Sequence, residues 1–127
     1  MNFKLLDFQI FGDERGSLIS LEGNKNIPFE IKRVYYIFDT KNDVVRGKHA
    51  HKNLQQILIA VNGSCKVLLD NKQDKKIYEL SNPSQGLFIQ NKTWREIFEF
   101  SSDCVLMVLA SDYYNKEDYI FEYENIF

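Results

Sequence analysis

The chain has 127 residues, of which 44% are hydrophobic, and its 16 basic and 18 acidic side chains give a net charge of −2. These values fit a single globular domain (residues 1–127) and exclude a disordered chain. The balanced charge excludes the basic surface that attracts nucleic acid or an anionic membrane, and no apolar run approaches the roughly 20 residues of a membrane span.

Short runs rich in Ile, Val, Phe and Tyr recur along the chain and are typical of β-strands. We predict strands at residues 3–11, 17–22, 31–39, 56–62, 64–70, 76–80, 86–89, 94–100 and 105–111. Between them, Asn62-Gly63 is the strongest hairpin signal and Asp70-Asn71 is a weaker one. The pattern predicts an all-β sandwich or barrel, with at most a single helical turn in residues 113–127.

The run at residues 33–38 is apolar on both faces. We therefore expect a strand covered on both sides, by the barrel interior on one and by a second sheet or a partner chain on the other.

The N-terminus and the cysteines predict the compartment. Asp7 interrupts the segment that a signal peptide would keep apolar, so we expect a cytoplasmic protein. Cys65 and Cys104 lie in apolar runs, and in that compartment two buried thiols are expected rather than a disulfide.

The only two histidines of the chain, His49 and His51, stand two residues apart in the segment Arg46-Gly47-Lys48-His49-Ala50-His51. If this segment is extended, both imidazoles point to one surface, because side chains of a strand alternate between its faces. Histidine is the side chain best suited to proton transfer near neutral pH, so the pair predicts acid–base chemistry.

The histidine pair and the residues after it resemble the first motif of the cupin superfamily, and residues 86–95 stand where its second motif is expected. A metal-binding cupin uses three histidines and a glutamate. Here Gln56 takes the acidic position, and the second region has Trp94 and Arg95 but no histidine. An amide is a poor ligand and an arginine repels a cation, so we predict no metal.

Several segments together resemble one family, the dTDP-4-keto-6-deoxyhexose 3,4-ketoisomerases (WxcM-like sugar ketoisomerases). They are residues 13–18, 33–37, 46–51, 93–96, 108–114 and 118–120. The order and spacing of these segments are more specific than any one of them. The resemblance implies a single antiparallel cupin-type jelly-roll barrel and a homodimer that exchanges N-terminal strands.

The resemblance also implies an isomerase that acts on a dTDP-linked keto sugar and needs no cofactor. The C4 ketone acidifies the C3 proton, a base removes that proton to give an enediol, and return of a proton at C4 gives the 3-keto sugar. The expected destination is a 3-amino or 3-acetamido-3,6-dideoxyhexose for a surface glycan such as lipopolysaccharide.

Three residues match catalytic positions of that family. His49 matches the acid–base position, and an imidazole with a pKa of roughly 6.5 can take and return a proton. His51 is expected either to share the proton transfers or orient the sugar, or to be a hydrogen-bonded structural residue. Tyr35 matches the active-site tyrosine and would act on the enediol oxygens, unless it is a core aromatic residue.

Six further residues are expected at the substrate: Arg15, Arg46, Gln56, Trp94, Arg95 and Arg33. Arg15 and Arg46 would hold the diphosphate, since a guanidinium forms paired hydrogen bonds with phosphate oxygens. Gln56 would hydrogen-bond the sugar. Trp94 would pack on the thymine or the sugar, or belong to the core.

Two other functions remain open from the sequence. A 3,5-epimerase of the same nucleotide sugars also uses a cupin barrel and a histidine base, but it tends to be longer and carries an aspartate partner for its histidine. A non-catalytic cupin that binds a sugar nucleotide belongs to a different class. The close spacing of His49 and His51 favours the ketoisomerase.

Overall fold

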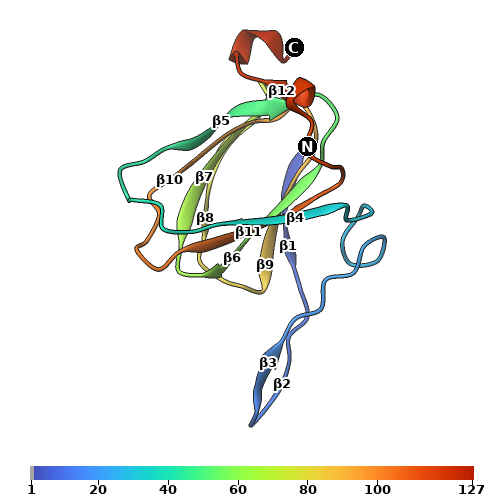
Figure 1. The fold of residues 1–127 in the computed structure, drawn as a ribbon, viewed down its shortest axis with the longest axis vertical. Coiled ribbons are helices and arrows are strands. Elements are labelled where there is room, and N and C mark those ends of the chain that lie inside the picture. The colour runs from blue at the N-terminus through green and yellow to red at the C-terminus, as the bar shows by residue number, and fades with distance from the viewer. Residues whose placement is uncertain (1) are drawn as a thin grey trace.

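The protein is seen here in a computed structural model that describes residues 2–127, and its regular secondary structure consists almost entirely of antiparallel strands (Figure 1). The strands are β1 (Phe3–Asp7), β2 (Phe11–Asp13), β3 (Gly16–Leu18), β4 (Arg33–Ile37), β5 (Arg46–His51), β6 (Gln56–Asn62), β7 (Cys65–Asp70), β8 (Lys75–Leu80), β9 (Gln85–Ile89), β10 (Trp94–Phe98), β11 (Val105–Ala110) and β12 (Tyr119–Ile120). Two 3₁₀ turns, η1 (Lys116–Asp118) and η2 (Tyr123–Asn125), lie in the C-terminal segment. The predicted all-β class is confirmed.

The strands form two five-stranded sheets that face each other as the walls of a jelly-roll barrel (Figure 1). One sheet has the order β1-β9-β6-β11-β4 and the other the order β12-β5-β10-β7-β8. Strands β2 and β3 pair only with each other and form a hairpin that projects from one end of the barrel. The C-terminal segment lies over the opposite end.

Three predicted elements differ from the structure. Residues 3–11 hold β1 and the start of β2, because the chain leaves the sheet after Asp7 to reach the hairpin. The strand predicted at 17–22 ends at Leu18, and the residues after it pack their apolar side chains against the barrel wall instead. The tail has two helical turns rather than one.

The hairpin predicted at Asn62-Gly63 is also wrong. Gly63 does turn the chain with a φ of +65°, but β6 and β7 on either side of it belong to opposite sheets. The turn is therefore a corner of the barrel. The weaker hairpin prediction at Asp70-Asn71 is confirmed, because β7 and β8 are paired antiparallel along their whole length.

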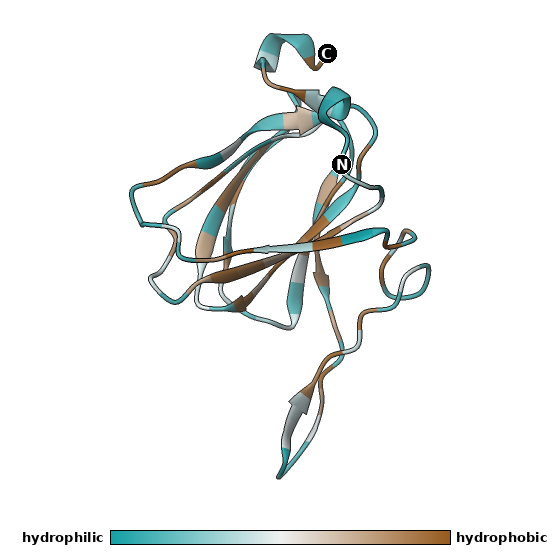
Figure 2. Ribbon diagram, in the orientation of Figure 1, coloured by the Kyte–Doolittle hydropathy of each residue, from teal (hydrophilic) through white to brown (hydrophobic). Residues whose placement is uncertain are grey.

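Most of the barrel interior is an apolar core. Alternate residues of the strands point inward, so that one strand contributes Leu58 and Ala60 and another contributes Leu106 and Val108. Figure 2 shows β11 as one of the most hydrophobic segments, whereas the C-terminal turns above the barrel are hydrophilic. This core holds the two sheets together by removing apolar area from water.

The outer faces of both sheets are partly covered by the same chain. Ile57 and Ile59, which alternate with the inward residues of β6, are buried against Ile27 and Phe29 from the connection between β3 and β4. On the other sheet Ala50 is buried against Ile120 and Ile126 of the C-terminal segment. The second contact matters for the site, because it fixes the tail onto β5.

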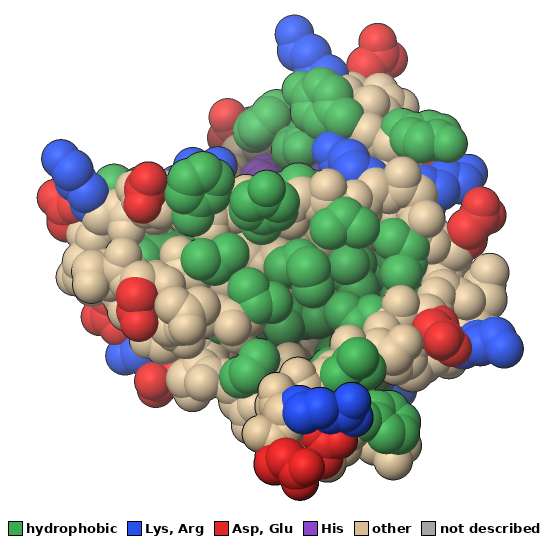
Figure 3. All heavy atoms as spheres, turned by 60° about the horizontal axis from the view of Figure 1, so that its bottom comes forward, with side chains coloured by type: hydrophobic (Ala, Val, Ile, Leu, Met, Phe, Trp, Pro, Cys, Tyr) green, Lys and Arg blue, Asp and Glu red, His purple; other side chains and the backbone are tan. Residues whose placement is uncertain are grey.

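The outer face of β4 is not covered within the chain. Tyr35 and Ile37 point into the core, as the alternation predicts, but Val34 and Tyr36 are 53% and 64% exposed. Strand β4 is also the edge of its sheet. Figure 3, which turns the bottom of Figure 1 forward, shows hydrophobic side chains gathered in the middle of the face that it views. Within residues 2–127 no second sheet covers this face, so the first of the two predicted covers is wrong, and a partner chain stays a prediction.

None of the helical turns in residues 2–127 has the length and apolar character to cross a membrane.

Candidate active site

At one end of the barrel the inward-facing side chains change from apolar to polar. Along β6, Gln56 precedes Leu58 on the inner face, and along β10, Arg95 precedes Ile97. The same end receives the C-terminus of β5 with its two histidines. A polar layer thus lies directly on the apolar core, and the strand periodicity that builds the core also positions this layer.

A bulge in β5 shapes the site. Glu96 pairs with Gly47 and Arg95 pairs with His49, so Lys48 is an extra residue in the strand. Gly47 and Lys48 both have left-handed backbone angles, with φ of +87° and +56°. A Cβ on Gly47 would lie 3.1 Å from the backbone oxygen of Arg95, so glycine is required for this close approach.

The two imidazoles lie side by side inside the barrel, as predicted from their spacing. Their ring centroids are 4.9 Å apart, and the rings are nearly perpendicular. Nδ1 of His49 lies 3.0 Å from the backbone oxygen of Gly47, and Nδ1 of His51 lies 3.0 Å from Oδ2 of Asp118. Both oxygens can only accept, so in each neutral ring Nδ1 carries the hydrogen and Nε2 offers a lone pair.

A chain of hydrogen bonds joins three of the predicted residues. Arg95 donates through Nη1 to Oε1 of Gln56, and it donates through Nη2 to the backbone oxygen of Thr93 at 3.2 Å. The amide nitrogen of Gln56 donates to the hydroxyl of Tyr35 at 3.0 Å. The residue in the place of a cupin metal ligand therefore holds a guanidinium and a phenol in position.

The electrostatics of the pair follow from this burial. Loss of hydration, and then the charge of Arg95, lower the pKa of His49 from 6.5 to about 4, although the hydrogen bond to Gly47 works in the opposite direction. Burial and Arg95 also lower the pKa of His51 well below its ordinary range. The carboxylate of Asp118 favours the charged ring, but the buried surroundings outweigh it. Both rings are neutral bases at physiological pH.

Arg95 supplies a buried positive charge. Burial lowers its pKa to about 10, so it stays charged at neutral pH. Its hydrogen-bond acceptors are an amide and a backbone carbonyl rather than a carboxylate, and its Nε has no partner. Nε2 of His51 also lacks one. Buried polar atoms are normally paired, so these free atoms indicate a place for a polar ligand.

The C-terminal segment closes the site. Tyr119 of β12 lies 4.8 Å from the His49 ring and 4.5 Å from the His51 ring, measured between centroids. A cavity of about 120 Å³ beside His51 is lined by this segment and by Arg33. The Arg33 guanidinium lies over the ring of Tyr35 at 5.0 Å. Arg33 therefore belongs to the site.

Three residues that were predicted at the substrate lie away from this site. Trp94 is on the face of β10 opposite to Arg95 and packs against the tail, with its ring centroid 6.0 Å from that of Tyr123. Arg46 is exposed at the start of β5. Arg15 lies at the tip of the projecting hairpin, 85% exposed and paired with Asp13 at 2.6 Å.

Asp118 and Tyr119 enter the site without a predicted role. The motif at residues 118–120 contributes to the family resemblance, but Asp118 is 67 positions from His51. A motif search could select these residues, whereas no local spacing rule could place them beside the histidines.

The side chains of the site do not form a metal-binding group. In the part of the chain from residue 2 to 127, no three His, Cys, Asp or Glu side chains are grouped to hold one. The position that an acidic ligand would take is occupied by Gln56, which is already bonded to Arg95 and Tyr35. These donors do not fit a cation.

Comparison with known proteins gives a consistent result. The family described as "FdtA: WxcM-like, C-terminal" matches residues 1–127. A TDP-4-oxo-6-deoxy-alpha-D-glucose-3,4-oxoisomerase from Aneurinibacillus thermoaerophilus is 54% identical over 125 residues, which cover 98% of this chain and 90% of that protein.

Two solved structures are similarly close. A 3,4-ketoisomerase from Helicobacter canadensis is 51% identical with a TM-score of 0.95, and the match covers 99% of this chain and 95% of that one. A histidine-to-asparagine mutant of the 3,4-ketoisomerase QdtA from Thermoanaerobacterium thermosaccharolyticum, in complex with TDP-4-keto-6-deoxyglucose, is 47% identical. Its TM-score is 0.95, and the match covers 98% of this chain and 91% of that one.

Proposed function

The chain belongs to the FdtA, WxcM-like C-terminal family, and on that premise we propose that it is a sugar-nucleotide 3,4-ketoisomerase. It converts a dTDP-4-keto-6-deoxyhexose to the dTDP-3-keto-6-deoxyhexose. The product supplies a 3-amino or 3-acetamido-3,6-dideoxyhexose for a surface glycan. The two free buried thiols suit the reducing conditions of the cytoplasm, where sugar nucleotides are made.

The observation that carries the proposal is the pair of neutral imidazoles beside a buried guanidinium. An isomerisation through an enediol needs a base that is unprotonated at neutral pH and a positive charge near the oxygen that becomes negative. His49 and His51 each offer Nε2, and Arg95 is a cation without a carboxylate partner. A binding module would not need two such bases.

Each residue has a defined part in the reaction. His49 removes the proton from C3, the electrons of that C–H bond form the C3–C4 double bond, and the C4 oxygen takes the negative charge. Arg95 stabilises this enediolate. His51 and Tyr35 move the proton from the C3 oxygen to the C4 oxygen, while His49 returns a proton to C4 and C3 becomes the ketone. No electrons leave the sugar, so the reaction needs no redox cofactor.

The reaction is independent of metal ions, because the guanidinium takes the part that a cation would otherwise have. Gln56 holds both Arg95 and Tyr35, and so it aligns the groups that face the sugar oxygens. Arg33, beside the same cavity, binds the substrate.

The nucleotide end of the site is completed by a second copy of the chain. The hairpin residues Ile10, Phe11 and Leu18 are between 52% and 59% exposed, and the outer face of β4 is an uncovered sheet edge. A homodimer that exchanges this N-terminal part buries both surfaces. In this exchange Arg15 of the hairpin reaches the diphosphate of the substrate that is bound to the other chain. Arg46 of the chain that binds the substrate lies at the same diphosphate.

The test is to incubate the protein with dTDP-4-keto-6-deoxyglucose, with and without EDTA, and to follow the sugar by NMR. The expected result is movement of the ketone carbon from C4 to C3 at equal rates in both samples. A ketone that stays at C4 while the C3 and C5 protons exchange would identify an epimerase. Binding without any exchange would identify a non-catalytic cupin. Loss of activity in EDTA, with recovery on adding a divalent metal, would contradict the metal-free mechanism.

A further inference from the structure

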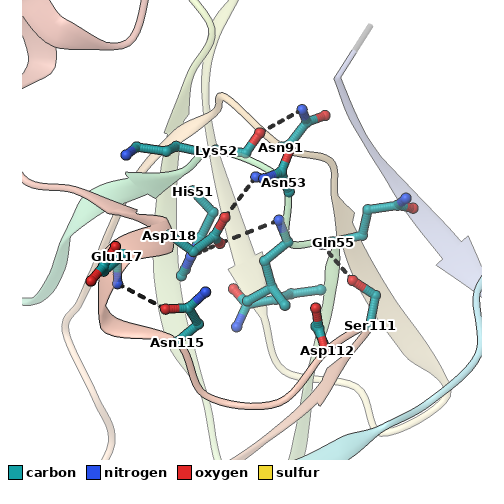
Figure 4. Close-up of polar contacts among 12 residues, drawn as sticks. His51, Lys52, Asn53, Gln55, Asn91, Ser111, Asp112, Asn115, Glu117 and Asp118 are labelled. Carbon is teal, nitrogen blue, oxygen red and sulfur yellow. Dashed lines mark hydrogen bonds and ion pairs between the residues drawn. The ribbon is translucent and has the colours of Figure 1, made fainter.

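Asp118 in the C-terminal segment makes four hydrogen bonds to the end of β5 and to the turn that follows it. Its Oδ2 accepts from Nδ1 of His51 at 3.0 Å and from the backbone N–H of Leu54 at 3.3 Å. Its Oδ1 accepts from the backbone N–H of Asn53 at 2.9 Å, and its backbone oxygen accepts from the N–H of Lys52 at 2.9 Å. Figure 4 shows this side chain directed into the turn that follows β5.

The carboxylate determines which nitrogen of His51 carries the proton. A neutral imidazole has two tautomers, and a carboxylate can only accept a hydrogen bond. The contact to Asp118 therefore stabilises the form with hydrogen on Nδ1. The other nitrogen, Nε2, is buried, and no group of residues 2–127 bonds to it. In the opposite tautomer Nε2 would donate, and His51 could not accept a proton from the sugar.

We propose that Asp118 is the positioning residue of the site: it fixes the His51 tautomer and ring orientation, and so presents Nε2 to the sugar as a proton acceptor. This role rests on the proposed isomerase activity. It assigns the C-terminal segment a function in the reaction, because Asp118 reaches the barrel only when that segment is docked.

Docking of the segment does not depend on Asp118 alone. Tyr119 and Ile120 pair with His51 and Ala50 in the sheet, and the hydroxyl of Tyr123 donates to Oδ1 of Asp70 on β7 at 3.1 Å. Trp94 lies beneath the segment, against Tyr123. These contacts provide both a control substitution and a built-in reporter, because Trp94 is the only tryptophan of the chain.

The test compares the wild-type protein with the Asp118→Ala and Asp70→Ala variants. Because the chain has two histidines, ¹⁵N NMR of the imidazoles resolves each ring, and the His51→Asn variant assigns the signals. Trp94 fluorescence reports whether the segment is docked. Turnover of dTDP-4-keto-6-deoxyglucose gives kcat and KM.

We expect wild-type His51 to carry its hydrogen on Nδ1, and Asp118→Ala to shift it toward Nε2 with Trp94 emission unchanged. The value of kcat should fall by at least about tenfold, approaching the roughly 10⁴-fold loss that follows replacement of the aspartate in a catalytic triad. KM should change little, since Asp118 does not face the nucleotide. Asp70→Ala should keep the wild-type tautomer and kcat, although it also removes a carboxylate that holds the C-terminal segment.

Three results would overturn the proposal: a wild-type His51 with hydrogen on Nε2, an Asp118→Ala variant with unchanged tautomer and kcat, or an Asp70→Ala variant with the same loss as Asp118→Ala. If Asp118→Ala undocks the segment, Asp118→Asn replaces it, and the wild-type tautomer alone still decides the outcome. The tautomer is measured without substrate, so failure of the isomerase proposal is seen separately, as absent turnover by the wild-type protein.

Discussion

The two ends of this molecule are built in opposite ways. At the end beneath the C-terminal segment, polar side chains lie inside the barrel and the chain itself covers them. At the hairpin end, apolar side chains lie outside, and Phe11 and Leu18 are more than half exposed. Buried polar groups at one end and exposed apolar groups at the other each cost free energy unless something binds them.

The contrast between the two ends suggests that each end has its own function. The polar end holds the groups that we propose for proton transfer, and these groups all come from one chain. For the apolar end we propose a partner chain, and Arg15 on the hairpin is the residue that would link the two ends. Substitutions at one end should therefore leave the property of the other end intact, and four predictions use this separation.

The largest effect is expected from His49→Asn, which should abolish measurable turnover. A general acid–base residue contributes about 10²–10⁴-fold in rate, and here one imidazole serves both carbon steps. Thermal stability, the dimer mass and nucleotide affinity should remain close to those of the wild-type protein. His51→Asn should slow the reaction less severely. Near-normal turnover by His49→Asn would remove this residue from the mechanism.

The second prediction concerns association. Leu18→Asp places a charge on the exposed apolar hairpin and should convert the dimer to a monomer, as measured by light scattering. Ile77→Asp is the matched control, because Ile77 on β8 is 56% exposed against 59% for Leu18. It should leave the mass unchanged. A monomeric wild-type protein, or equal effects of both substitutions, would contradict the assignment of the hairpin to the interface.

The third prediction concerns the link between the ends. Arg15→Ala should raise KM roughly 10–100-fold, which corresponds to the loss of a charge-assisted hydrogen bond of about 1.5–3 kcal/mol. The value of kcat should change much less, because Arg15 does not touch the sugar carbons. Lys25→Ala removes an equal charge from another exposed position and serves as the control. An unchanged KM in Arg15→Ala would place the diphosphate elsewhere.

The smallest effect is a pH dependence of stability. Folding lowers the pKa of His49 from 6.5 to about 4, so between these values the unfolded chain binds a proton that the folded chain does not. The free energy of unfolding should therefore decrease as the pH falls through this window, by about 1.4 kcal/mol per pH unit for each such histidine. Urea unfolding should show that the free energy of unfolding of His49→Asn falls less steeply with decreasing pH, because the contribution of one histidine is removed. An identical slope would mean that His49 is not buried as a neutral ring.

The sequence predicted the polar end better than the connections around it. The i, i+2 spacing of His49 and His51 was sufficient to put both rings on one face, and Gln56 in the position of a cupin metal ligand indicated a different kind of site. Asn62-Gly63 failed as a hairpin because the local turn does not determine which sheet the next strand joins. That choice depends on long-range pairing, here of β7 with β10.

The placement of the other residues shows the same limit. Trp94 and Arg95 are adjacent in sequence, yet strand alternation sends them to opposite faces, and only the structure shows which face is the interior. Asp118 reaches His51 through the folding of a tail that has little periodic pattern. Arg15 lies away from the site within one chain, so its predicted role stays a proposal that depends on a second copy.

The most direct test of the proton-transfer mechanism is the isomerisation of dTDP-4-keto-6-deoxyglucose in deuterated water, with deuterium at C4 of the product measured by NMR. The account predicts partial incorporation by the wild-type protein, because one imidazole carries the proton from C3 to C4 and exchanges part of it with solvent. The His49→Asn variant should form no product. An unlabelled C4 in the wild-type product, together with normal turnover by His49→Asn, would contradict the account and indicate a hydride shift.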